Sequence, residues 1–269
     1  MKKRWLYFLL SSCLYFLSQH ATAIETIRYG GATTLQKSYM PKATEIFSQG
    51  KAVKFVIQGG NTTPGMNLLL KSNLDIAGGG RFLSAAEKRD GLVEVQVGWD
   101  ALIPIINVNN PVTDITFAQL KAIFEGKLTN WKELGGSDEE ILLYIAPKKS
   151  AIRKAQQKLI LDYAPFSKQS RETPRVPSNA IDIIANKVGG IGVISKGLIA
   201  SNPNDAVKTL TVDGVNPTPQ TIQSKQYTLV KPLILATKGE AQGLVKEFID
   251  FTLSDTGKEI MNKSFFSLD

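Results

Sequence analysis

Apolar runs alternate with short polar loops along this chain, and their order predicts strand–loop–helix units. Residues 53–57 (VKFVI) form a β-branched run that is typical of a strand in a covered sheet. Residues 58–63 (QGGNTT) follow as a glycine turn that ends in small polar residues. Apolar positions 66, 69 and 70 then predict a helix with one buried face, and residues 75–80 return the chain to the sheet.

The start of this predicted helix has features that suit an anion. Pro64 fits the first helical position, where its missing N–H costs nothing, and Thr62 or Thr63 is suited to cap the helix. A helix start carries free backbone N–H groups and a partial positive charge, and nearby glycines let the backbone approach a ligand closely. From these residues alone, a well-capped helix after a glycine turn remains the simpler explanation.

The same pattern occurs elsewhere in the chain. Residues 24–29 alternate as a first strand, and residues 30–34 (GGATT) precede a helix through residues 43–47. Residues 141–145 form another strand, and residues 147–150 (PKKS) lead into another helix. The first two units, in succession, build parallel β-structure and place both helix starts at the carboxyl edge of the sheet, where ligands bind in open α/β sheets.

The rest of the chain continues this alternation of strands and helices. Further strands are predicted over residues 93–97, 100–107, 190–194, 207–212 and 227–237, the last interrupted by Pro232. Further helices are predicted over residues 117–124, 179–187, 217–223, 240–253 and 254–263. The fold class is therefore predicted to be α/β. With 269 residues and 43% hydrophobic content, the chain can form one large domain or two smaller ones.

The amino terminus has the pattern of an export signal. A basic start at residues 2–4 precedes an apolar run over residues 5–17 and a small-x-small site at residues 21–23 (ATA). Residues 1–23 are therefore predicted to be a signal peptide that is removed. Residues 10–13 (LSSC) resemble a lipobox, so lipidation at Cys13 is the alternative. It is the less favoured one, because the apolar run continues past Cys13, where a mature lipoprotein usually turns polar.

Histidine and cysteine occur once each, as His20 and Cys13, and both lie in the predicted signal peptide. The mature chain then excludes Ser-His-Asp and Cys-His catalysis, metal sites built on His or Cys, and disulfides. The formal charge of +8 becomes +5 once Lys2, Lys3 and Arg4 are removed, a mildly basic balance that suits an anionic ligand. No phosphate-loop or nucleic-acid motif appears, so the sequence predicts no enzyme, no cofactor and no nucleic-acid partner.

Four stretches carry a resemblance to a known family. Residues 123–136 (IFEGKLTNWKELGG) resemble the periplasmic phosphate-binding proteins of bacterial phosphate ABC transporters. Residues 212–218 (VDGVNPT), 227–233 (YTLVKPL) and 248–254 (FIDFTLS) match the same family in order and spacing. The resemblance covers essentially the whole mature chain. It implies a type II periplasmic binding fold, with mixed central sheets flanked by helices in two lobes and a ligand cleft between the lobes.

The resemblance also implies how the chain is divided and what it does. Crossing segments are expected near residues 99–104 and 225–232. Lobe 1 would comprise residues 24–99 and 232–269, and lobe 2 residues 100–231. The implied protein is a periplasmic monomer that binds phosphate or a related oxyanion, closes its cleft like a hinge and delivers the ligand to a membrane permease.

In this family, loops at three helix starts hold the anion. Their counterparts here are residues 31–34, residues 59–65 and residues 146–153, and the strand after the second loop ends at Gly80, followed by Arg81 as in many members. The resemblance therefore implies a set of ligand-binding residues: Thr33, Thr34, Asn61, Thr62, Thr63, Arg81, Ser150 and Arg153.

Six positions depart from the family pattern. Asn61 and Thr63 replace glycines of the second loop, and four further departures lie in or near the loops. Gly80 lacks the side-chain oxygen of the family's Asp or Ser, Ala146 stands where the family has Arg, and Ala151 and Ile152 replace a Gly and a Thr. Each lost hydrogen bond to a charged ligand in a closed cleft costs about 1.5–3 kcal/mol, or about tenfold or more in affinity. A second hypothesis therefore stays open: the same fold binds a different small solute, or serves sensing or surface interaction with little phosphate binding.

Overall fold

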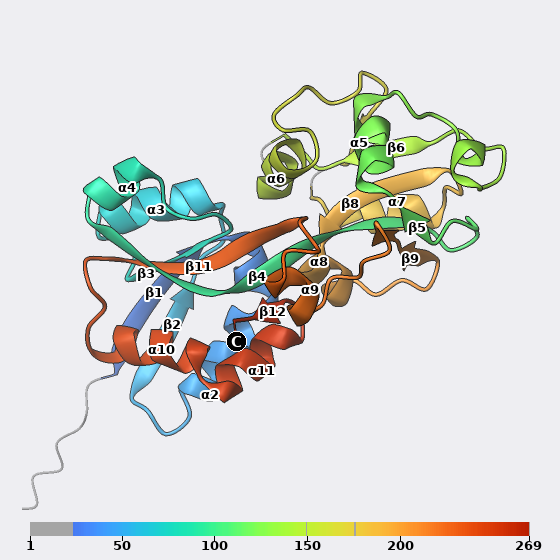
Figure 1. Cartoon of the computed structure of the whole chain (residues 1–269). Coiled ribbons are helices and arrows are strands. Elements are labelled where there is room, and N and C mark those ends of the chain that lie inside the picture. Colours follow the sequence, from blue (N-terminus) through green and yellow to red (C-terminus); the bar gives the residue numbers. More distant parts are fainter. Residues whose placement is uncertain (1–23, 149, 175, 269) are drawn as a thin grey trace, which may run out of the picture.

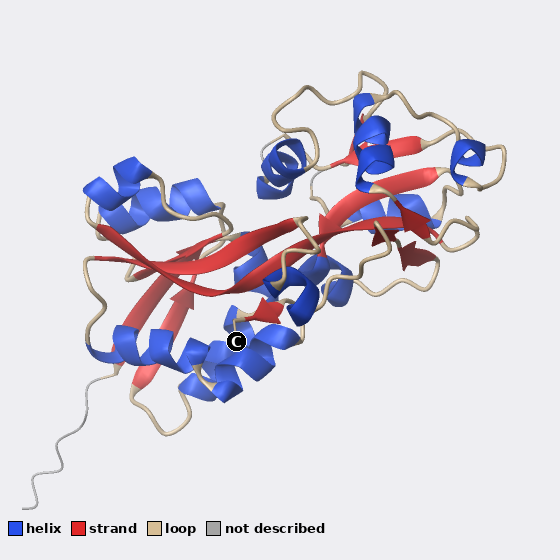
Figure 2. Cartoon of the chain, viewed as in Figure 1, coloured by secondary structure: helices blue, strands red, loops and turns tan. Residues whose placement is uncertain are grey.

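A computed structural model describes residues 24–148, 150–174 and 176–268 of the chain, so the predicted signal peptide, residues 1–23, lies outside the described residues. Helices cover a mixed β-sheet, and the α/β prediction is confirmed (Figure 2). Within the described ranges, no helix combines the length and apolar character that crossing a bilayer requires.

The elements alternate along the chain. The strands are β1 Glu25–Gly31, β2 Val53–Ile57, β3 Ile76–Gly79, β4 Leu92–Asn107, β5 Asp114–Ile115, β6 Leu142–Ile145, β7 Arg171–Glu172, β8 Gly190–Ser195, β9 Val207–Thr209, β10 Thr211–Val212, β11 Val230–Lys238 and β12 Phe266–Ser267. The helices are α1 Thr33–Ser38, α2 Met40–Phe47, α3 Thr62–Leu70, α4 Ala85–Arg89, α5 Phe117–Glu125, the 3₁₀ turn Trp131–Leu134, α6 Ala151–Leu159, α7 Asn179–Ala185, α8 Lys196–Ser201, α9 Pro219–Gln223, α10 Gly243–Leu253 and α11 Asp255–Asn262.

One long strand, β4, runs through both lobes of the molecule (Figure 1). Over residues 92–101 it pairs antiparallel with β11, and over residues 102–106 it pairs antiparallel with β8. The strand order is therefore β2-β1-β3-β11-β4-β8-β6-β7. The sequence predicted two separate strands here, but β4 continues across Gly98 and Trp99 because β11 pairs with both of these residues.

The predicted parallel units are confirmed. Strand β1 pairs parallel with both β2 and β3, and β6 pairs parallel with β8. A Cβ on Gly65 would lie 2.6 Å from the Cα of Gly31, so only glycine allows this approach of α3 to the end of β1. Gly31 also has φ 119°, a conformation that other residues rarely adopt. These two glycines bring the first two helix starts to the same edge of the sheet.

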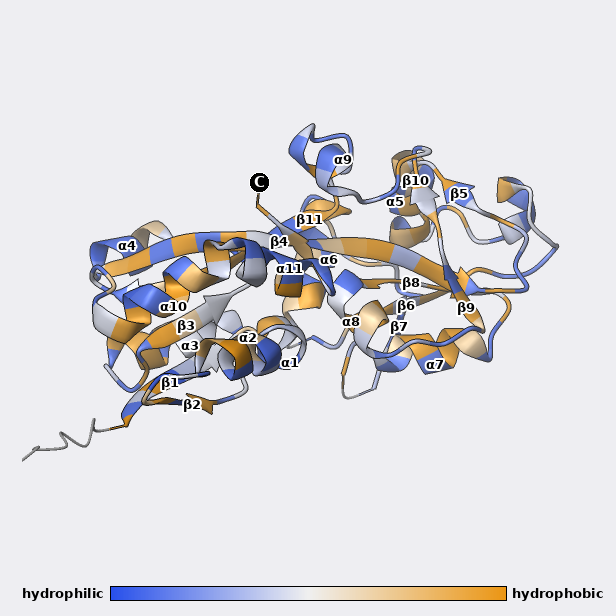
Figure 3. Cartoon of the chain, turned by 90° about the horizontal axis from the view of Figure 1, so that it is seen from below, coloured by the Kyte–Doolittle hydropathy of each residue, from blue (hydrophilic) through white to orange (hydrophobic). Residues whose placement is uncertain are grey.

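Hydrophobic side chains cover both faces of the sheet in each lobe. In the lobe that holds β1–β3, Phe248 packs with α2 and α11 on one face, and Met66 of α3 packs on the other. In the lobe that holds β6 and β8, Trp131 and Ile184 belong to separate clusters on opposite faces. Figure 3 shows that hydrophobic residues predominate along the central strands, whereas the outer helices alternate hydrophobic and hydrophilic residues.

Two local predictions are wrong. Helix α3 begins at Thr62 and its N-cap residue is Asn61, so neither threonine caps it, and Pro64 is its third residue rather than its first. Pro64 still fits, because the first-turn N–H groups of a helix have no acceptor within the helix. Pro232 does not interrupt β11: it pairs with Trp99 inside a continuous strand.

A buried ion pair lies where β4 and β11 cross from one lobe to the other. Lys231 Nζ lies 2.7 Å from Asp100 Oδ2, and the two side chains are 7% and 0% exposed. Ser195 Oγ lies 2.7 and 2.8 Å from the two Asp100 oxygens and donates to this carboxylate. Lys231 and Asp100 face each other in the β4–β11 register, so the pair ties the two crossing strands together.

We expect Asp100→Ala to lower the free energy of unfolding by about 3–5 kcal/mol, because it leaves the buried Lys231 ammonium without its partner. Urea unfolding followed by circular dichroism measures this change. The matched control is Glu45→Ala, which removes an ion pair whose side chains are 51% and 58% exposed and should change stability by less than about 1 kcal/mol. Equal effects of the two substitutions would contradict the structural role of the crossing pair.

Candidate functional site

Two adjoining cavities lie between the lobes. The larger has a volume of about 450 Å³ and the smaller about 230 Å³. Both are lined by helix α3 of one lobe, helix α6 of the other lobe and β11, which crosses between the lobes. The residues that line both cavities are Asn61, Thr62, Gly80, Ala151 and Lys231. The two cavities therefore form one continuous cleft.

Starts of helices from both lobes meet at the smaller cavity. Thr33 and Thr34 of α1 line it, together with Asn61 and Thr62 at the start of α3 and Ser150 at the start of α6. Two further residues of the predicted set, Thr63 and Arg81, line the larger cavity. The structure thus brings seven of the eight predicted residues to one cleft, although they come from loops far apart in the sequence.

Thr62 lies at the junction of the two cavities. Its side chain is buried, and its Oγ1 accepts a hydrogen bond of 2.9 Å from the backbone N–H of Gly80. The hydroxyl hydrogen of a threonine that already accepts remains available to a ligand. The side chain of Asn61, at the N-cap position, makes no capping hydrogen bond to α3. The first-turn N–H groups of α3 are therefore not capped by that side chain.

Thr33 and Ser150 have local hydrogen bonds. Thr33 Oγ1 donates to the carbonyl of Gly60 at 2.5 Å, which ties the first loop to the second. Ser150 is the N-cap of α6, and its Oγ accepts from the backbone N–H of Ile152 at 3.1 Å. Both hydroxyls thus shape the loops that line the smaller cavity.

Arg153 is the one predicted residue that lines neither cavity. Its guanidinium donates to the carbonyl of Ala146 at 2.9 Å and lies 4.1 Å from the centre of the Phe166 ring. Glu172 Oε2 lies 3.7 Å from its Nη1. Burial lowers the pKa of Arg153, and Glu172 opposes that change. These contacts hold the guanidinium within its own lobe.

Arg81 lines the larger cavity while its charge is paired. Its two terminal nitrogens each lie 2.8 Å from one oxygen of Glu87, a bidentate geometry. The hydrogen bonds from Arg81 are the main reason that the pKa of Glu87 falls to about 2. The same nitrogens reach the carbonyl of Phe82 at 2.9 Å and Thr63 Oγ1 at 3.4 Å. Arg81 is therefore held in one orientation at the rim.

Lys231 is a cleft residue that the sequence did not indicate as a site residue. It lines both cavities from the crossing strand, with its ammonium held by Asp100. A Cβ on Gly80 would lie 3.4 Å from its Nζ, so the lysine fills space beside this glycine. The sequence signal was present, since Lys231 belongs to the stretch 227–233 that matches the family. However, only the fold places its side chain between the lobes.

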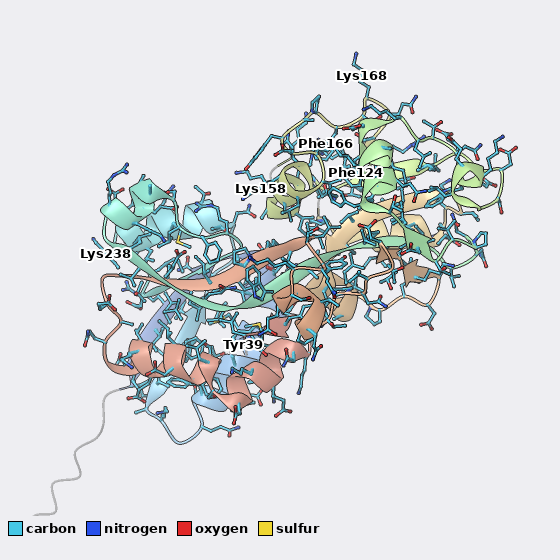
Figure 4. All side chains as sticks on the ribbon, in the orientation of Figure 1. Tyr39, Phe124, Lys158, Phe166, Lys168 and Lys238 are labelled. Carbon is cyan, nitrogen blue, oxygen red and sulfur yellow. The ribbon has the colours of Figure 1, made fainter. Side chains whose placement is uncertain are left out.

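The charged side chains that line the cleft are all cationic. Lys37 lines the smaller cavity, and Lys154 and Lys158 of α6 line the larger one; Figure 4 shows Lys158 on the side of α6 that faces α3. No carboxylate is among the lining residues of either cavity, and none in the described part of the chain lies within 4.0 Å of these three ammonium groups. Such a cleft attracts anions.

The described part of the chain does not gather the side chains of a metal site. Among the described residues, no group of three or more His, Cys, Asp or Glu side chains is arranged to ligate one. The arrangement of helix starts, hydroxyls and cations instead suits an oxyanion, which accepts hydrogen bonds on every oxygen.

The Arg81–Glu87 pair predicts a pH-dependent contribution to stability. The pKa of Glu87 is about 2 in the folded protein, below its ordinary value of 4.5. The contribution is therefore complete above pH about 4.5 and is lost as the pH falls towards 2. We expect Glu87→Gln to lower stability by about 1–2 kcal/mol at pH 7, because the exposure of Arg81 weakens the pair, and by progressively less at lower pH.

Thermal unfolding of both proteins between pH 7 and pH 2 measures this difference. The control is Glu247→Gln, which removes the exposed pair with Lys51 and should have little effect at any pH. A stability difference for Glu87→Gln that stays constant over the whole range would show that the charge of Glu87 is not the cause.

Comparison with known proteins places this chain in a family. The family model described as "PBP superfamily domain" matches residues 18–256. A curated relative, the phosphate-binding protein PstS of Bacillus subtilis (strain 168), is 30% identical over 233 residues, which cover 86% of this chain and 76% of the relative.

Solved structures agree with the sequence comparison. The putative phosphate ABC transporter substrate-binding protein of Clostridium perfringens, with bound phosphate, superposes with a TM-score of 0.78 at 29% identity and covers 91% of this chain and 100% of its own. The phosphate transport receptor of Vibrio cholerae gives a TM-score of 0.75 at 25% identity, with 90% and 100% covered. The chain belongs to the PBP superfamily, in the group of ABC transporter substrate-binding proteins that includes PstS.

Proposed function

We propose that this protein is an extracytoplasmic receptor that binds phosphate and delivers it to the permease of an ABC transporter. The observation that carries the proposal is the smaller cavity, where loops at helix starts from both lobes converge on a cationic, carboxylate-free space. The relatives named as phosphate-binding proteins and the similar structure with bound phosphate support the same ligand.

Each part of the cleft has a role in this proposal. The first-turn N–H groups of α3 and the hydroxyls of Thr34, Thr62 and Ser150 donate hydrogen bonds to the phosphate oxygens. Thr33, whose hydroxyl donates to the Gly60 carbonyl, holds the first loop against the second. Lys231 supplies a buried positive charge from the crossing strand, beside Gly80. This charge compensates in part for the arginine that the family pattern has at Ala146, a residue that is buried here.

Cleft closure completes the site, because its donors come from both lobes. We assign residues 24–99 and 232–269 to lobe 1 and residues 100–231 to lobe 2, since β4 changes its pairing partner from β11 to β8 after Ala101. A ligand held by α3 of lobe 1 and α6 of lobe 2 would stabilise the closed form. The protein acts as a monomeric binding protein without catalysis, exported by its amino-terminal signal.

Phosphate binding should depend on the hydroxyl of Thr62. Calorimetry on the mature protein should show phosphate binding that weakens by about tenfold or more in Thr62→Val, because this isostere removes the hydroxyl and leaves the Gly80 N–H without its acceptor. Thr62→Ser keeps the hydroxyl and should retain most of the affinity. The matched control is Thr44→Val, the same change at another buried threonine, which bonds within α2 and lines neither cavity.

The outcomes separate the hypotheses. Phosphate binding that weakens about tenfold or more in Thr62→Val and is unchanged in Thr44→Val supports the proposed receptor. Absence of phosphate binding to the wild-type protein would overturn it and favour a different ligand for the same fold. Sulfate is titrated in parallel, because the cleft-lining residues include no carboxylate to accept a hydrogen bond from a protonated oxyanion.

A further inference from the structure

The larger cavity contains more room than an inorganic anion needs. A tetrahedral oxyanion has five non-hydrogen atoms. Even if each atom took the roughly 30 Å³ that a water molecule occupies in the liquid, the anion would fill only roughly 150 Å³. The larger cavity alone measures about 450 Å³, within the range of roughly 300–1,000 Å³ that is typical of sites for organic ligands. It opens directly onto the phosphate-binding residues, because Asn61, Thr62 and Lys231 line both cavities.

Two exposed aromatic side chains line this cavity from opposite lobes. Phe82 is 47% exposed and Tyr163 is 65% exposed. Among the described residues, 24–148, 150–174 and 176–268, no other aromatic side chain is classed as exposed. Both belong to the lining of the larger cavity, Phe82 from the segment after β3 and Tyr163 from the segment after α6. Leaving aromatic surface in water is unfavourable, and its concentration at one concave site indicates a binding surface.

Both aromatic residues are held in place by their surroundings. The Phe82 ring meets the ring of Trp99 edge-on, with centroids 6.5 Å apart and an interplanar angle of 89°. Tyr163 has φ 67°, an uncommon conformation for a bulky residue. Its backbone N–H donates to the carbonyl of Gln157 at 2.9 Å, which fixes this turn at the end of α6. Uncommon backbone conformations are often found at functional sites, and this one presents the exposed Tyr163 ring at the cleft.

Charges continue along the same wall. Lys154 and Lys158 of α6 line the larger cavity with Tyr163, and Arg81 lines it beside Phe82. Aliphatic surface comes from Leu159 and Pro232. The larger cavity therefore combines an apolar body with a cationic rim, and it adjoins the helix starts and hydroxyls that line part of the smaller cavity.

We propose that the cleft takes an organic phosphate, a phosphomonoester or phosphonate whose apolar or aromatic group lies between Phe82 and Tyr163 while its phosphoryl group occupies the smaller cavity. This inference rests on the proposed function and deepens it, because the same hydroxyls and helix starts bind the phosphoryl oxygens. Closure of the lobes brings the two aromatic residues onto opposite sides of the organic group. Apolar contact of this kind adds affinity in proportion to the area that it removes from water.

Calorimetry with phenyl phosphate, inorganic phosphate and phenol tests the proposal on the mature protein. We expect phenyl phosphate to bind at least about fivefold more tightly than inorganic phosphate and to compete with it for one site. Phenol alone should bind weakly. Phe82→Ala should weaken phenyl phosphate about five- to tenfold and leave inorganic phosphate unchanged. Tyr163→Asn should do the same, and asparagine tolerates the positive φ at this position.

Control measurements distinguish the alternatives. Val108→Ala removes an exposed apolar side chain that lines neither cavity and should change neither affinity. Thermal unfolding of each variant tests whether it is folded.

The outcomes separate this inference from the proposed receptor. The inference is overturned, and the phosphate receptor left intact, if inorganic phosphate binds and phenyl phosphate does not. The same holds if the variants weaken the binding of both ligands equally. Phenyl phosphate that binds without inorganic phosphate would overturn the receptor for inorganic phosphate and support the organic ligand. Failure of both ligands would overturn both proposals.

Discussion

The ion pair between Asp100 and Lys231 lies on the two strands that connect the lobes. The crossing itself must hold its shape, while the lobes on either side of it must be able to move relative to each other. Two strands, β4 and β11, carry the chain between the lobes, and this pair joins them at positions that face each other in their register. Ionised groups taken out of water are costly unless each has a close partner, and here Ser195 adds further hydrogen bonds to the carboxylate. The crossing is thereby fixed locally, while each lobe has its own hydrophobic core.

Separate cores explain how the cleft can work as a site. The clusters around Phe248 and around Trp131 each stabilise one lobe, so the space between the lobes does not need to be filled by protein side chains. The starts of α3 and α6 face that space from opposite sides. A ligand that accepts hydrogen bonds from both lobes then supplies the contacts that the open cleft lacks, which is the physical basis of hinge closure.

Some of the cations that line the cleft are paired with carboxylates, and others are not. Arg81 is paired with Glu87 and Lys231 with Asp100, so these two cations are held in position by carboxylates that lie behind them. Lys154 and Lys158 have no such partner among the described residues and keep the larger cavity attractive to anions. Fixed cations give orientation, whereas unpaired lysines on a helix surface contribute a broader field. The combination suits an anionic head with room for an attached group.

The sequence by itself determined the α/β class and the parallel strand–loop–helix units, and its resemblance to a known family indicated which loops meet at the cleft. It succeeded there because glycine turns, hydroxyls and hydrophobic periodicity act locally and leave a readable pattern. Only the tertiary structure decided the cap of α3, the continuity of β4 through Trp99, the orientation of Arg153 towards Phe166 and the placement of Lys231 between the lobes. Each of these depends on contacts with residues distant in sequence or on competition between neighbouring polar groups. Local propensity carries no information about which strand or side chain a residue will meet once the chain has folded.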